Sequence, residues 1–139
     1  MKDKEILLKQ YEMMVDTTQN VTSWRMASNS FYLTINTALI GFILYTSAST
    51  SLIEKCVLAA IGIVSAFLWY YSLDYYRKLN TAKWAVVATI EKKLPLQAFT
   101  KLEYDGYKDK IRKEITIIEK WLPAAFGIAY LLIILYILV

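Results

Sequence analysis

Three long stretches without a charged side chain constrain this chain more than any other feature. Residues 26–53 form an uncharged run of 28, residues 56–73 one of 18 and residues 121–139 one of 19. A helix needs about 20 apolar residues, and no fewer than about 17, to cross the hydrocarbon core of a bilayer. The sequence therefore predicts an all-α, multi-pass membrane protein with three spans, near residues 29–48, 56–74 and 121–139.

The distribution of basic residues predicts the orientation of these spans. Fifteen of the sixteen Lys and Arg residues lie in residues 1–27 and 75–120, and only Lys55 lies between the first two spans. Cytoplasmic segments of membrane proteins are enriched in basic residues. We therefore expect the N-terminus and residues 75–120 in the cytoplasm and the C-terminus outside. Acidic residues are interleaved with the basic ones and no nucleic-acid-binding motif surrounds them, so we expect contact with membrane lipids and none with nucleic acid.

The apolar pattern continues outside the spans. Before the first span, a row of side chains repeats at intervals of four and three residues, the spacing of a helix packed against a partner: Leu7, Tyr11, Met14, Thr18, Val21 and Arg25. Pro95 should end the second helix, because proline lacks an amide hydrogen. We predict three long helices, each part transmembrane and part cytoplasmic stalk, in a homo-oligomeric bundle. Association is expected because a stalk of about 70 residues is small for an independent core.

The chain then divides into four segments. Residues 1–27 are expected to form a cytoplasmic amphipathic helix, and residues 28–74 a hairpin of the first two transmembrane spans. Residues 75–120 form the cytoplasmic helical stalk, and residues 121–139 the third span.

Polar side chains on the first span are the candidate functional residues. Asn29 and Asn36 lie seven residues apart on one side of the predicted helix, with Thr34 and Thr37 beside them. One interpretation is that they form hydrogen bonds between helices that fix the packing. The other is that they line a pore around an oligomer axis. The sequence favours the first without excluding the second.

A face of small residues lies on the same span. Ser30, Thr34, Thr37 and Gly41 follow one another at spacings of four, three and four. Small side chains allow two helix backbones to approach closely within a bilayer, where no hydrophobic drive holds helices together. This face is therefore expected to contact another helix.

A structural ion pair is expected at the cytoplasmic ends of the first two spans. Arg25 precedes the first span and Asp74 follows the second at the same predicted depth. The alternative for Arg25 is an anchor in the lipid headgroups. We favour the pair with Asp74, which also has Arg77 and Lys78 three and four residues further on.

Signatures of catalysis are missing from the sequence. It has no histidine, one cysteine (Cys56), no glycine-rich phosphate loop, no nucleophile elbow and no cluster of metal ligands. Acids such as Glu91 are expected to be solvated. We therefore expect no enzymatic activity, no catalytic residues, no cofactor and no metal.

Three stretches resemble a known family. They are WRMASNSFYLTINTALIG at 24–41, YYRKLNTAKWAVVATIEKKLP at 75–95 and IEKWLP at 118–123. The most specific part is a motif in the second stretch, made of Arg77, Leu79, Asn80, Ala82, Lys83, Leu94 and Pro95. On these residues the chain resembles the RipA-like family of small octameric bacterial inner-membrane proteins. The resemblance implies a homo-oligomer, of eight subunits, in the bacterial cytoplasmic membrane.

Three functions are compatible with these features. The first is a non-enzymatic homo-oligomer with a cytoplasmic helical stalk, which acts as a scaffold, a sensor or a platform for a partner. The second is a regulated pore or channel lined by the Asn and Thr residues of the first span. The third is an accessory subunit of a transporter or membrane complex, bound to an unidentified protein partner.

Overall fold

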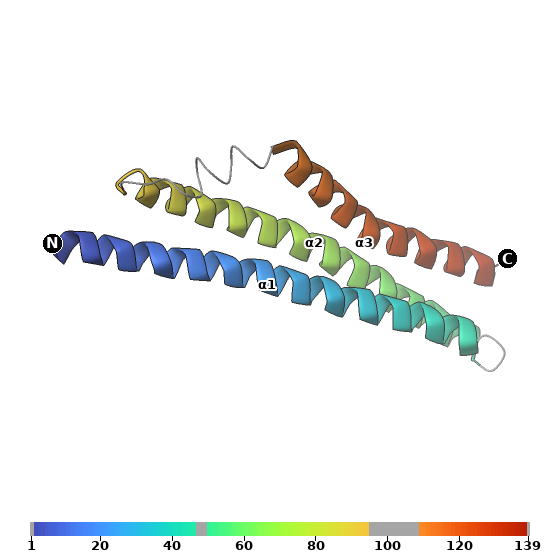
Figure 1. Cartoon of the computed structure of the whole chain (residues 1–139). Helices are drawn as coiled ribbons and strands as arrows, with labels where there is room; N and C mark the ends of the chain where they lie inside the picture. The colour runs from blue at the N-terminus through green and yellow to red at the C-terminus, as the bar shows by residue number, and fades with distance from the viewer. Residues whose placement is uncertain (1, 47–49, 95–108, 139) are drawn as a thin grey trace. The chain divides into compact units, whose positions relative to one another are not determined.

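A computed structural model of the chain consists of three helices (Figure 1): α1 (Lys2–Tyr45), α2 (Leu52–Glu91) and α3 (Asp109–Leu138). It describes residues 2–46, 50–94 and 109–138, and it contains no strand within them. All three helices are long and apolar enough to cross a membrane, with mean hydropathies of 1.2, 1.9 and 2.2 in their most apolar windows. The predicted all-α, multi-pass membrane fold is confirmed.

The ends of α2 follow from local sequence. At its start, the amide of Ser51 donates to Glu54, and the amide of Glu54 donates to the Ser51 hydroxyl, both at 3.3 Å. This reciprocal capping box satisfies amides that lack a partner in the first turn. After Glu91 the amides of Lys93 and Leu94 bond to carbonyls only three residues back. A change from bonds four residues back to bonds three residues back is common in the final turn of a helix. The predicted stop at Pro95 lies outside the described residues.

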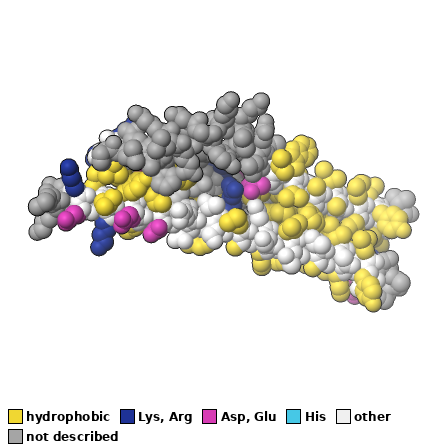
Figure 2. Space-filling view, viewed as in Figure 1, with side chains coloured by type: hydrophobic (Ala, Val, Ile, Leu, Met, Phe, Trp, Pro, Cys, Tyr) yellow, Lys and Arg dark blue, Asp and Glu magenta, His cyan; other side chains and the backbone are white. Residues whose placement is uncertain are grey.

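The contacts divide the chain into two compact units, each described here by itself. The charged unit contains Met1–Arg25 and Asp74–Thr116, and the apolar unit contains Met26–Leu73 and Ile117–Val139. These boundaries fall two, one and four residues before the predicted segment boundaries after residues 27, 74 and 120. The visible surface of the apolar unit is almost entirely hydrophobic or uncharged (Figure 2). Which unit lies on which side of a membrane stays a prediction.

The apolar unit packs all three helices around a few buried side chains. Ile43 of α1, Ala59 of α2 and Tyr130 of α3 form its central cluster. The Tyr130 ring lies directly over Gly62, where an added Cβ would come within 2.2 Å of the ring. Pro123 lies inside α3 and is buried. A glycine on α2 thus makes room for the Tyr130 ring of α3.

In the charged unit, α1 and α2 pack along the predicted row of side chains. Thr18 and Val21 of α1 are 1% exposed, and Val87 of α2 is fully buried. Leu7, Tyr11 and Met14, nearer the N-terminus, are half-buried. The face of α1 that carries the row therefore turns toward α2.

Candidate functional site

Asn36 is the centre of a polar network that joins all three helices of the apolar unit. Its side chain is fully buried, and its amide nitrogen donates to the Tyr32 carbonyl (2.8 Å) and to the Ser65 hydroxyl (3.1 Å). The Tyr130 hydroxyl lies 3.1 Å from the Asn36 carbonyl oxygen and 3.2 Å from its side-chain oxygen, and donates to them. Burying an amide costs free energy unless its hydrogen bonds are made, so this network fixes how the helices meet.

Asn29 holds a second contact on the same side of α1. Its side-chain oxygen accepts a 2.9 Å hydrogen bond from the indole nitrogen of Trp69, which is 1% exposed. The Trp69 ring stacks on Tyr32 at 6.2 Å between centroids and lies 5.9 Å from the Phe126 ring. Asn29 thus turns toward α2 of its own chain, and Asn36 toward both α2 and α3.

The two threonines lie on a different side of α1. Thr34 and Thr37 are exposed, and the Thr34 hydroxyl donates to the Ser30 carbonyl at 2.8 Å. A helix turns by about 100° per residue, so Thr34 and Thr37 cannot share the direction of Asn36. The structure therefore brings Asn36 together with Tyr130 and Asn29 together with Trp69, and separates both asparagines from the threonines. We call the exposed row of Ser30, Thr34, Thr37 and Gly41 the hydroxyl face.

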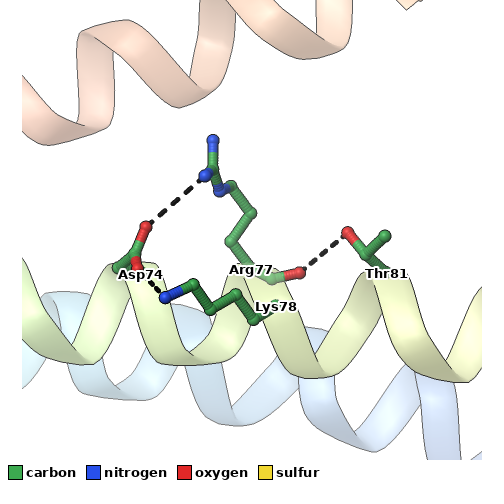
Figure 3. Close-up of polar contacts among 4 residues, drawn as sticks. All are labelled: Asp74, Arg77, Lys78 and Thr81. Atoms are coloured by element: carbon green, nitrogen blue, oxygen red, sulfur yellow. Dashed lines mark hydrogen bonds and ion pairs between the residues drawn. The ribbon is translucent and has the colours of Figure 1, made fainter.

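Asp74 pairs with two basic residues one turn further along α2 (Figure 3). Lys78 Nζ lies 2.9 Å from one carboxylate oxygen and Arg77 Nη2 lies 3.5 Å from the other. The Thr81 hydroxyl donates to the Arg77 carbonyl at 3.0 Å. Pairs on a helix surface at these spacings contribute a few tenths of a kcal/mol each. Arg25 is half-buried, and its predicted pair with Asp74 stays a prediction.

The family-like motif does not converge on one site. Arg77 and Ala82 are exposed, whereas Leu79, Asn80, Lys83 and Leu94 are half-buried, and Pro95 lies outside the described residues. The Asn80 side-chain oxygen is buried and finds no hydrogen-bond partner in the part of the chain that the structure describes. The motif residues therefore point in several directions around α2.

Glu91 is the residue that sequence reasoning placed wrongly. It was expected to be solvated, yet it is fully buried and accepts a 2.8 Å hydrogen bond from the Tyr11 hydroxyl. The signal was present in the spacing, because Glu91 follows the buried Val87 by one helical turn and Tyr11 belongs to the inward row of α1. Within the described residues, no group of three potential ligands could hold a metal ion.

Comparison with protein families gives one match. A model of the octameric membrane protein family matches residues 8–139, which covers nearly the whole chain and all three helices. The chain belongs to this family. The resemblance found in the sequence is therefore confirmed at the level of the family. Comparison with curated proteins and with solved structures finds no match.

The apolar unit also carries exposed aromatic side chains. Tyr70, Tyr71 and Trp121 of the apolar unit are exposed, and Lys120 Nζ lies 5.0 Å above the Tyr70 ring. Aromatic rings and basic side chains gather at the headgroup layer of membrane proteins. The apolar unit thus carries the features of a membrane-spanning region.

Proposed function

We propose that this chain forms a non-enzymatic homo-octamer in the bacterial cytoplasmic membrane and serves as a scaffold, a sensor or a platform for a partner. The apolar unit spans the membrane, and the charged unit forms a cytoplasmic stalk. The number of subunits follows the name of the family, and the orientation follows the excess of basic residues in the charged unit. The exposed hydroxyl face carries the proposal.

The hydroxyl face lies within the first transmembrane segment. Within the described part of the chain, no other helix covers this face. Ser30, Thr34, Thr37 and Gly41 are all exposed, and a Cβ added at Gly41 meets nothing within 4 Å. In a bilayer, such faces support close helix contacts, because small side chains let backbones approach. Neighbouring copies of the chain are the available partners in a homo-oligomer.

Substitution of Gly41 by Leu tests this arrangement. A Cβ added at Gly41 meets nothing within 4 Å in its own chain, so the position has room for added bulk unless another copy covers it. We expect Gly41→Leu to shift the protein from the oligomer toward smaller species on native gels of gently solubilised membranes. Ala60→Leu, which adds the same side chain at an exposed position of α2, is the matched control. If Gly41→Leu leaves the oligomer unchanged, the hydroxyl face does not lie between copies of the chain.

A pore is the second candidate function, supported by the exposure of Thr34 and Thr37. Its wall would contain these threonines rather than Asn29 and Asn36, whose side chains are bonded within the chain. Recording from the purified oligomer in planar bilayers separates the candidates. A conductance altered by Thr34→Val or Thr37→Val supports the pore, and silence from an intact oligomer supports the scaffold. Co-purification of a partner at fixed ratio would instead favour an accessory subunit.

A further inference from the structure

The charged unit carries an exposed row on α1 that points away from its own α2. Met13 is 61% exposed, and Glu5 and Asp16 are exposed on either side of it along the helix. No described residue of the same chain forms an ion pair with either acid. The buried Thr18 and Val21 mark the opposite, inward direction. Lys9 is exposed between Glu5 and Met13 on the same side, so this row combines one apolar contact point with two acids and one base.

The charged unit also carries a row of opposite charge, formed by α2 and by Lys93 in the turn that follows it. Val86 is 45% exposed, Lys93 is exposed and Lys83 is partly exposed, whereas Val87 and Glu91 face inward. The apolar side chain again lies between two charged ones, and here both charges are positive. The acids at the two ends of the α1 row therefore match the lysines at the two ends of the second row, with one apolar side chain of each row between them.

The two rows also lie at similar positions along the helix axes. The bond between Tyr11 and Glu91 places residue 11 of α1 level with residue 91 of α2. Because the two helices run in opposite directions, residue 13 is then level with about residue 89. Each complementary pair is offset from this alignment by three or four residues, in the same direction: Met13 with Val86, Asp16 with Lys83, and Glu5 with Lys93. Such an offset is about 5 Å at 1.5 Å per residue, within reach of these long side chains.

We propose that, in the oligomer, this row of α1 in one copy packs against this row of α2 in the next, with Met13 on Val86 between two ion pairs. The inference rests on the proposed homo-oligomer. Copies in a ring are related by rotation about an axis along the membrane normal. This rotation leaves each residue at the same position along that axis, so two rows can meet only if they lie at similar positions along it. A ring requires two different faces on each subunit, and α1 and α2 supply them. Contact between two α1 rows would oppose Glu5 to Glu5 and Asp16 to Asp16, which like charges disfavour.

Disulfide cross-linking between two chains, each with one cysteine, tests the contact. Full-length Met13→Cys and Val86→Cys chains with different tags are co-expressed in a Cys56→Ala background and oxidised in native membranes. We expect a dimer that carries both tags. Tyr75→Cys replaces Val86→Cys in the matched control, because it is exposed but lies about 16 Å away along α2. The control pair should give no mixed dimer.

Charge exchange provides an independent measurement. Glu5→Lys in the Met13→Cys chain should lower the yield of the mixed dimer about two- to fivefold, as expected for one exposed ion pair, and Lys93→Glu in the Val86→Cys chain should restore it. The proposed contact would be overturned by disulfide dimers between two Met13→Cys chains, or by an intact oligomer that gives no mixed dimer. Neither result would contradict the proposed homo-oligomer. Absence of any oligomer by native mass measurement would instead refute the proposed function.

Discussion

At the scale of single residues, Gly62 decides how closely α2 and α3 approach. An added Cβ would lie 2.2, 2.2 and 2.6 Å from three atoms of the Tyr130 ring, and that ring is fully buried. Gly62→Ala should therefore lower the free energy of unfolding in detergent by about 1–3 kcal/mol, the usual cost of overpacking a core. Gly127→Ala is the matched control, because nothing lies within 4 Å of its added Cβ. Equal stability of the two variants would contradict the packing.

The buried carboxylate of Glu91 is the second decisive residue. Its hydrogen bond from Tyr11 satisfies an oxygen of a fully buried carboxyl group. Tyr11→Phe leaves that oxygen with one donor fewer, so we expect the free energy of unfolding to fall by about 1–3 kcal/mol. Tyr75→Phe removes a hydroxyl from an exposed side chain and should have no measurable effect. An unchanged free energy of unfolding in Tyr11→Phe would show that this hydrogen bond contributes little to the stability of the charged unit.

At the scale of elements, the start of α2 depends on the capping box of Ser51 and Glu54. Ser51→Ala removes the hydroxyl that accepts from the Glu54 amide and should cost about 1 kcal/mol of unfolding free energy. Glu54→Gln keeps an oxygen that can accept from the Ser51 amide, so its effect should be small. Chemical denaturation of both variants in the same detergent measures the difference. A larger loss in Glu54→Gln than in Ser51→Ala would argue against this cap.

The helices themselves follow closely from sequence, because uncharged length and the absence of early proline or glycine are local properties. The inward row of α1 was also predictable, since Thr18 and Val21 belong to one regular spacing. The faces of the first span were harder to assign. Asn36 and Thr34 are both polar, and only the positions of Ser65 and Tyr130, distant in sequence, decide that Asn36 is buried and Thr34 exposed. Burial of Glu91 likewise depends on Tyr11, eighty residues away.

At the scale of the whole molecule, each unit leaves a different kind of surface for neighbouring copies. The apolar unit exposes the hydroxyl face of α1, and the charged unit exposes complementary rows on α1 and α2. Faces of small residues support close helix contact within the bilayer, and charge complementarity outside it selects which faces meet. We therefore propose that the apolar unit provides most of the affinity between copies and that the charged unit sets their register.

The mass of the particle released directly from native membranes is the most direct test of this account. For a homo-octamer of 16.1 kDa chains, the account predicts a single protein species of about 129 kDa. That mass should fall when Gly41 is replaced by Leu. A species of 16.1 kDa under the same gentle conditions, with no larger protein assembly, would contradict the claim that copies of this chain cover one another's exposed faces.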